Sequence, residues 1–253
     1  MLLRRQLLLQ ALTTAGAGAA LPGGAAPLPA AGEHVQIFSG RIVKRITLRY
    51  LLWMPPAASK PSTGWPLLFF LHGSGERGRN LAKLKTYGPA RYAAAGRQFP
   101  FVLVAPQVRE GMAWDSDALE ALRIDLFARL PIDPDRVLMT GLSMGGYGTW
   151  NYAVDYPDRL AAIAPVCGAG DNDRAERIKH LPVWAFHGAR DDVVPIADDQ
   201  AMVDALKAAG GTVRFTVYPD VGHNAWEPAY ADPALYAWLM AQRRSNPTHS
   251  SST

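Results

Sequence analysis

Thr140-Gly-Leu-Ser-Met-Gly-Gly-Tyr-Gly-Thr-Trp150 is the stretch from which the fold of this chain is best inferred. It follows a short apolar run at 136–140, typical of a buried strand, and it precedes a segment with helical character. The pattern Gly141-Leu-Ser-Met-Gly145 therefore lies at a strand-to-helix turn, where G-x-S-x-G holds a serine hydroxyl out at the top of a sheet. Small residues on both sides of Ser143 let neighbouring backbone pass close to the turn. The sequence thus predicts Ser143 as a nucleophile and the backbone N–H of Met144 as a donor to an oxyanion.

Segments typical of strands and helices alternate along the chain around this turn. Apolar runs predict strands at 66–71, 101–105, 136–140, 160–166, 182–186 and 213–218, and alternation predicts an antiparallel strand within 42–53. Helices are expected at 81–95, 117–130, from Ser143 to about 156, 196–209 and 233–242. This order implies an α/β domain over residues 33–242, with a mostly parallel sheet and helices on both faces.

The first 32 residues have the composition of an export signal followed by a leader rich in Pro, Gly and Ala. Arg4-Arg-Gln-Leu-Leu8 resembles the twin-arginine signal, although Leu3 stands where that signal usually has Ser or Thr. A general secretory signal and a membrane anchor are the alternatives, but polar residues and glycines interrupt the apolar part too often for a stable spanning helix. We expect cleavage between residues 20 and 32, periplasmic or secreted delivery, and a disordered tail at 243–253.

Charge and composition narrow the classes of partner. The chain has 253 residues, 49% of them hydrophobic, and a net charge of +4, which suits one globular domain. Removal of Arg4 and Arg5 would leave a net charge of about +2, too small to favour nucleic acid or a membrane surface as a partner. The lone cysteine, Cys167, lies in an apolar run and is expected in the core. No residue spacing predicts a metal or a cofactor, and the oligomeric state stays open.

A serine nucleophile requires a general base, for which the chain offers six histidines. Three lie in segments expected to be exposed: His34, His180 and His249. His72 and His187 each end an apolar strand as His-Gly, which favours a buried ring bonded to nearby backbone. His223 follows the last strand, in a glycine-containing loop at the edge where Ser143 also emerges. It is the predicted base.

The acid of the triad should lie between serine and histidine in chain order, after another strand. Asp191 and Asp192 both qualify; Asp191 is favoured and Asp192 remains the alternative. The second oxyanion donor should come from His72-Gly-Ser-Gly75, with the N–H of Ser74 preferred to that of Gly75.

Two tryptophans are candidates for binding substrate, because Trp114 lies in a loop after a strand and Trp226 is three residues from His223. The alternative for each is an aromatic residue of the core or the rim.

Four motifs resemble those of the α/β-hydrolase superfamily: Leu71-His-Gly-Ser-Gly-Glu-Arg-Gly78, Gly141-Leu-Ser-Met-Gly-Gly-Tyr-Gly148, His187-Gly-Ala-Arg-Asp191 and Gly222-His-Asn-Ala-Trp226. They look most like those of exported esterases known as phospholipase/carboxylesterase or predicted peptidase, near dienelactone hydrolases, feruloyl esterases and polyhydroxybutyrate depolymerases. The resemblance covers about residues 35–242. It implies Ser143 as nucleophile, Asp191 as acid and His223 as base. Dienelactone hydrolases themselves use cysteine as the nucleophile, so the serine departs from their pattern.

The predicted function is a serine carboxylic-ester hydrolase that forms an acyl-enzyme and needs no metal or cofactor. The segment 167–181 is too short for a large lid, so we expect an open site. The expected substrates are exposed esters, either esters linked to a polymer such as an acylated polysaccharide or esters that carry an aryl group. A serine peptidase of the same fold and a catalytically inactive binding module are the alternatives.

Overall fold

The computed structural model describes residues 9–10 and 41–244 and divides the chain into two units, residues 1–46 and 47–253. In the first unit, β1 (Leu9–Gln10) pairs antiparallel with β2 (Arg41–Ile42). The rest of the predicted export signal and leader, and residues 245–253 of the predicted tail, lie outside the described residues, as do His34 and His249.

The second unit contains a seven-stranded sheet with the order β3-β5-β4-β6-β7-β8-β9. The bounds of its strands are β3 Arg49–Trp53, β4 Trp65–Leu71, β5 Val102–Gln107, β6 Ile132–Leu142, β7 Ala162–Val166, β8 Val183–Gly188 and β9 Val213–Tyr218. β3 runs antiparallel to β5, and every other neighbouring pair is parallel. The predicted mostly parallel sheet is confirmed.

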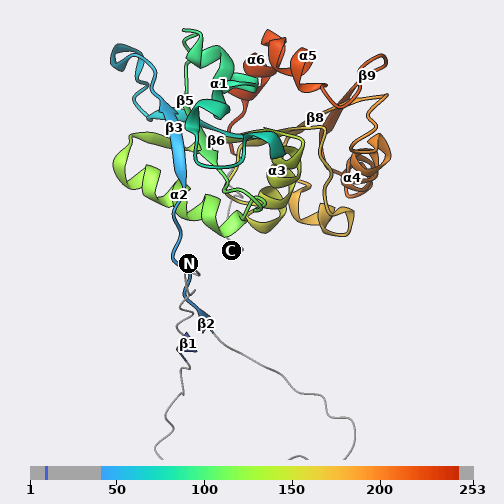
Figure 1. Ribbon diagram of the computed structural model, residues 1–253, viewed down its shortest axis with the longest axis horizontal. Coiled ribbons are helices and arrows are strands. Elements are labelled where there is room, and N and C mark those ends of the chain that lie inside the picture. The colour runs from blue at the N-terminus through green and yellow to red at the C-terminus, as the bar shows by residue number, and fades with distance from the viewer. Residues whose placement is uncertain (1–8, 11–40, 245–253) are drawn as a thin grey trace, which may run out of the picture. The chain divides into compact units, whose positions relative to one another are not determined.

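Helices cover both faces of this sheet (Figure 1). Their bounds are α1 Gly88–Ala94, α2 Ser116–Arg129, α3 Met144–Asp155, α4 Ile196–Ala208, α5 Trp226–Ala231 and α6 Pro233–Ala241, with 3₁₀ turns at Ala57–Ser59, Ser74–Glu76, Leu81–Lys85 and Asn172–Ile178. The apolar faces of α2, α3 and α4 share one buried cluster with the sheet, and those of α1, α5 and α6 share the other. β4 is buried along its whole length because it lies between these two layers.

Three elements differ from their prediction, and a fourth was not predicted. The helix expected at 81–95 is divided into a 3₁₀ turn that ends at Lys85 and α1, which begins at Gly88 with a φ of +64°. α2 is capped by Asp115, whose side chain accepts from the Ala118 N–H, and not by Asp117. The predicted strand at 42–53 enters the main sheet only from Arg49 onward, and α5 is an additional helix.

The predicted tail begins too early. Arg243 Nη1 lies 2.9 Å from Asp133 Oδ2, and Arg244 Nη2 lies 2.8 Å from Asp135 Oδ1. The backbone N–H of Arg244 also donates to the Asp135 carbonyl. These bonds hold the end of the described chain against the amino end of β6.

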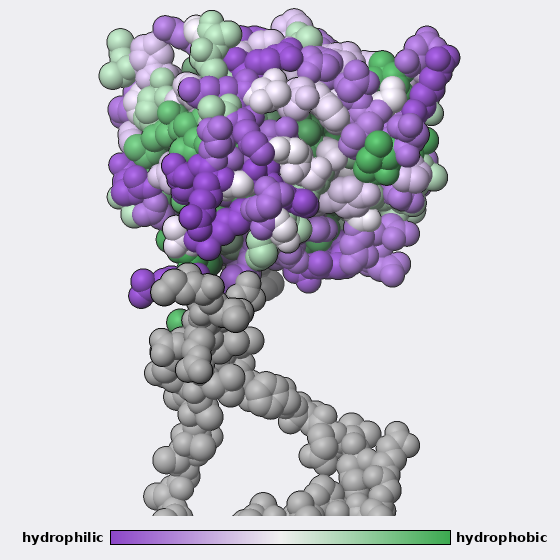
Figure 2. All heavy atoms as spheres, in the orientation of Figure 1, coloured by the Kyte–Doolittle hydropathy of each residue, from purple (hydrophilic) through white to green (hydrophobic). Residues whose placement is uncertain are grey.

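The surface of the main unit is largely polar on the face shown in Figure 2. Large apolar side chains that are exposed come from separate elements: Val43, Leu52, Met54, Met112, Ile124, Val193 and Val217. None of the helices in the described ranges has the length and apolarity needed to span a bilayer.

Candidate active site

Ser143 lies at a strained turn between β6 and α3. Its φ of +52° is in the left-handed region, which non-glycine residues seldom adopt. Two glycines make the turn possible. A Cβ on Gly145 would lie 2.0 Å from the Leu71 carbonyl oxygen, and one on Gly141 would lie 2.3 Å from the Gly145 oxygen. Close packing of α3 against β4 therefore fixes where the serine hydroxyl stands.

His223 joins Ser143 to Asp191. Its Nε2 is 2.8 Å from Ser143 Oγ, and its Nδ1 is 2.8 Å from Asp191 Oδ2. The three residues follow β6, β8 and β9, whose carboxyl ends meet at one edge of the parallel sheet. This is the geometry of a nucleophile, a base and an acid that orients the base.

Asp191, and not Asp192, is the aspartate against His223. Its side chain is buried, and its Oδ1 accepts from the backbone N–H groups of Val193 and Val194. Burial alone would raise the pKa of Asp191, but the hydrogen bonds from His223 and from these N–H groups outweigh it and hold that pKa below its usual value. Asp191 is thus an ionised acceptor, while Asp192 is exposed.

The loop after β4 carries the predicted second oxyanion donor. Ser74 begins a 3₁₀ turn directly after Gly73 and lies beside Ser143 and Met144 around one cavity. His72 holds this loop: the Val108 N–H donates to its Nε2 at 3.0 Å, so the proton lies on Nδ1 and is donated to the Gly73 carbonyl at 2.6 Å. Burial lowers the pKa of His72 to about 4, and the ring is neutral.

The cavity beside Ser143 has a volume of about 340 Å³ and is open to solvent. It is lined by Ser74, Ala113, Trp114, Ser143, Met144, Tyr147, Gly148 and Asn151. Sequence reasoning did not identify Tyr147 and Asn151, although their spacing of four and eight residues from Ser143 places them on the same face of α3. The cavity is a mixed surface, with one aromatic wall and several polar groups.

The two tryptophans occupy different positions. Trp114 lines the cavity and donates from Nε1 to the His72 carbonyl at 3.1 Å. Trp226 does not line this cavity; its ring packs edge-on against the His223 ring, with the centroids 5.2 Å apart. Trp226 therefore supports the ring of His223.

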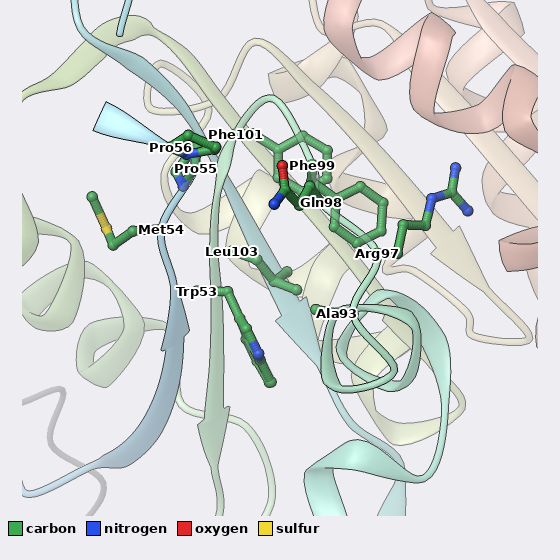
Figure 3. A pocket seen from close by; sticks show the side chains of 11 residues that line it. Trp53, Met54, Pro55, Pro56, Ala93, Arg97, Gln98, Phe99, Phe101 and Leu103 are labelled. Carbon is green, nitrogen blue, oxygen red and sulfur yellow. The ribbon is translucent and has the colours of Figure 1, made fainter. Parts of the chain in front are cut away.

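A second cavity, of about 280 Å³, lies at the opposite end of the sheet (Figure 3). Trp53 and Leu103, which line it, pair at the amino end of β5, whereas the triad is at the carboxyl edge. Its remaining lining includes Phe99, Phe101 and Gln98, none of which is a nucleophile or a base. Of these two cavities, the one beside Ser143 contains a hydroxyl bonded to an imidazole.

His187 is buried and bonded to nearby backbone, as predicted, and it also faces two carboxylates that were not expected. It contacts the carbonyl of Val194, but its two nitrogens also face Asp199 and Asp191. Asp199 was missed, and one signal could have found it: it occupies the apolar stripe of α4 that is formed with Met202, Val203 and Leu206.

Cys167 is buried, as expected, and lies behind the triad. Its Sγ, a carboxylate oxygen of Asp191 and a ring nitrogen of His223 all lie within 4.8 Å of one another. Burial and the charge of Asp191 raise the pKa of the Cys167 thiol to about 12, so it is protonated, and metals bind the thiolate form. Asp191 and His223 are already bonded to each other.

Comparisons with known proteins agree with the fold. The model of the dienelactone hydrolase family matches residues 103–235. A protein of Methylorubrum extorquens named "Putative carboxymethylenebutenolidase" is 32% identical over 185 residues, which are 65% of this chain and 63% of that protein. The chain is also similar to a thermostable esterase of known crystal structure, with 33% sequence identity and a TM-score of 0.68. The match covers 78% of this chain and 60% of the esterase. A ferulic acid esterase, at 19% identity, has the same fold with a TM-score of 0.57, over 76% of this chain and 90% of its own. The first two relatives are thus matched over less than two thirds of their length.

Proposed function

Since the chain belongs to the dienelactone hydrolase family and has the α/β-hydrolase fold, we propose that it is a serine carboxylic-ester hydrolase. The observation that carries this proposal is the His223 ring, with Ser143 Oγ at one nitrogen and Asp191 Oδ2 at the other, each at 2.8 Å. A hydroxyl bonded to an oriented imidazole is an activated nucleophile.

The reaction proceeds in two steps. As Ser143 Oγ attacks the ester carbonyl, its proton passes to His223 Nε2, which then gives that proton to the leaving alcohol. His223 next takes a proton from water as the water oxygen attacks the acyl-enzyme, and it then gives this proton back to Ser143 Oγ as the bond to the acyl group breaks and the acid is released. Asp191 stays ionised throughout and stabilises the protonated imidazole.

Two backbone N–H groups support the negative charge on the carbonyl oxygen. The N–H of Met144 is at the start of α3, where the helix dipole favours an anion, and that of Ser74 lies across the cavity. Each such donor lowers the barrier by about 3 kcal/mol.

The shape of the site supports exposed esters as substrates. The cavity is open, and the connection from β7 to β8 holds a short 3₁₀ turn and no lid domain. Trp114 offers a face for an aryl or short acyl group, and Tyr147 and Asn151 offer polar contacts. We include polymer-linked esters, and delivery to the periplasm or outside the cell, in the proposal.

The proposal is tested with a fluorophosphonate probe and p-nitrophenyl acetate. The wild type should be labelled and active, and Ser143→Ala should lose labelling and at least about 10⁴-fold in kcat. Ser62→Ala, which changes an exposed serine, is the matched control and should behave as the wild type. Labelling that persists in Ser143→Ala would contradict the proposal.

The ester class is tested by comparing short acyl esters, feruloyl esters, long-chain lipid emulsions and a peptide anilide. We expect the highest kcat/KM on short acyl or feruloyl esters. Preference for the emulsion would contradict the substrate class, and preference for the anilide would favour a peptidase.

A further inference from the structure

His187 is a buried imidazole with an acceptor oxygen at each ring nitrogen. Its Nδ1 lies 3.0 Å from Asp199 Oδ2. Its Nε2 lies 3.0 Å from the Val194 carbonyl oxygen and 3.3 Å from Asp191 Oδ2. His187 and Asp199 both have an exposed fraction of 0%. Because a neutral imidazole has a single N–H, it leaves one of these contacts without a proton unless Asp199 supplies it.

The position of Asp199 determines which nitrogen of His187 carries a hydrogen. Trp150 Nε1 donates to Asp199 Oδ1 at 3.1 Å, so the other oxygen is turned toward His187 Nδ1. An unprotonated Nε2 would face two oxygens with only lone pairs between them, which is unfavourable in a buried site. The shared proton lies on Nδ1 or on Asp199 Oδ2, and in both cases Nε2 carries a hydrogen.

Electrostatics at the pair agree with this arrangement. Burial of the ring opposes its charge, but the bond to Asp199, the bond to Val194 and the nearby carboxylates raise the pKa of His187. Burial raises the pKa of Asp199. Both shifts favour a proton held between the two groups.

We propose that His187 is a positioning residue for the triad acid, and that Asp199 fixes the tautomer in which His187 Nε2 carries a hydrogen, bonded to the Val194 carbonyl and placed 3.3 Å from the Asp191 carboxylate. The inference rests on the proposed function, since it gives Asp191 the role of acid. Asp191 Oδ2 then accepts from His223 and lies 3.3 Å from His187 Nε2, whose hydrogen bond goes to the Val194 carbonyl, while Oδ1 accepts two backbone N–H groups. Both oxygens of the Asp191 carboxylate are therefore fixed in position. Because the carboxylate also interacts with His187, it stabilises protonated His223 less than it would without His187.

The other groups around this pair do not supply the same hydrogen bond. Tyr147 on α3 and Cys167 after β7 face the carboxylates, and their pKa values are raised, first by burial, so both are neutral at pH 5 to 9. Asp192 and Asp198 are exposed. A shift in the acid limb of the pH profile after mutation of His187 can therefore be assigned to the loss of the His187 Nε2–H.

The tautomer is measured first, by nitrogen-15 NMR of the histidine rings in the wild-type protein between pH 5.5 and 9. We expect His187 Nε2 to carry a hydrogen throughout, and an unprotonated Nε2 would overturn the proposal. This measurement does not use activity. An inactive protein with the expected tautomer would count against the proposed function alone.

The role is then tested with two amide variants that reach different ring positions. In His187→Gln the amide N–H extends to the place of Nε2, where it can donate to the Val194 carbonyl and lie beside Asp191, whereas in His187→Asn it reaches only the place of Nδ1. We expect kcat within about 10-fold of wild type for Gln and a loss of about 10- to 100-fold for Asn, as for other partners that orient a catalytic group. Without the donor, Asp191 stabilises protonated His223 more strongly, so the acid limb of the Asn variant's pH profile should move up by about half to one pH unit.

A merely structural role predicts something else. It predicts that activity falls with thermal stability in both variants alike and that the acid limb stays in place; this result would overturn the proposal. His180→Asn, at an exposed histidine, is the control. If neither His187 variant folds, the histidine tautomer and the pH profile of Asp199→Asn test the proposal instead. Its amide can accept from Trp150 and donate to His187 Nδ1, so the tautomer and the acid limb should be kept, and loss of the Nε2 hydrogen there would contradict the inference.

Discussion

His72-Gly73 follows β4 and His187-Gly188 ends β8, so the two dipeptides lie at the same edge of the sheet. His72 is bonded to backbone groups, of Gly73 and Val108, and is neutral. His187 is bonded to Asp199 and the Val194 carbonyl and lies beside Asp191; burial opposes its charge, but these bonds and carboxylates raise the pKa of its ring. The strand buries the ring in both cases, but the neighbouring segment decides its chemistry: the end of β5 for His72 and the helix α4 for His187.

The largest difference in stability between the two strand ends should appear when the glycine of each His-Gly pair is replaced by alanine. A Cβ on Gly188 would lie 2.2 Å from the Gly222 carbonyl oxygen, which is backbone of the loop that carries His223. We expect Gly188→Ala to lose more than about 3 kcal/mol in the free energy of unfolding and about 100-fold in kcat, since the loop must move. On Gly73 the Cβ would meet the Leu142 side chain at 2.7 Å, which can rotate, so Gly73→Ala should cost about 1 to 2 kcal/mol. Urea unfolding measures both, and equal losses would refute this distinction.

Removal of the carboxylate that distinguishes His187 should have the next largest effect. Asp199→Ala leaves Trp150 Nε1 and His187 Nδ1 without a partner in a buried site, and we expect a loss of about 3 kcal/mol. The adjacent Asp198 is exposed on the same helix, and Asp198→Ala should change the free energy of unfolding by about 0.5 kcal/mol or less. Thermal unfolding of the pair of variants measures the contrast, and similar values would argue against a buried partner.

The two histidines should give opposite dependence on pH. The pKa of His72 is lowered in the folded state to about 4, so the unfolded chain binds more protons between pH 4 and 6.5 and stability falls as pH falls. We expect His72 to contribute a loss of about 2 kcal/mol between pH 7 and pH 5 that His72→Gln lacks. The pKa of His187 is raised, so its contribution is present below about pH 6.5 and is lost as pH rises through the folded value. Urea unfolding at several pH values tests this. If the free energy of unfolding of His72→Gln depended on pH as steeply as that of the wild type, the prediction would be contradicted.

The smallest effect concerns the indole beside His72. Trp114→Phe keeps an aromatic ring against His72 but loses the bond from Nε1 to the His72 carbonyl. We expect a loss of about 1 kcal/mol in the free energy of unfolding. A loss above about 3 kcal/mol in urea unfolding would mean that the ring position, and not the hydrogen bond, holds this strand end.

Much of the fold follows from local pattern in the sequence. Apolar runs at 66–71 and 213–218 became β4 and β9 because both are bounded by turn residues and packed by helices. Gly141, Ser143 and Gly145 indicated the turn because glycine is needed where two backbones meet. The break before Gly88 and the extra helix α5 were not predicted, since a positive φ and a helix of 6 residues leave little periodic signal.

The candidate site was predictable where it follows chain order and not where it depends on contacts across elements. Ser143, Asp191 and His223 each follow a strand, so their meeting at one edge was expected from topology. The contact of His187 with Asp199 depends on the rotation of α4 about its axis, which no local motif reports. The same holds for Trp226, whose place against His223 depends on the packing of α5.

The bonds from Arg243 and Arg244 to Asp133 and Asp135 also have a practical meaning. They fasten the described end of the chain at the start of β6, whereas Ser143 follows the finish of that strand, a separation on the order of 25 Å. We therefore expect that a purification tag or a fused carbohydrate-binding module attached directly after Arg244 would begin at the end of β6 that is remote from Ser143 and its cavity.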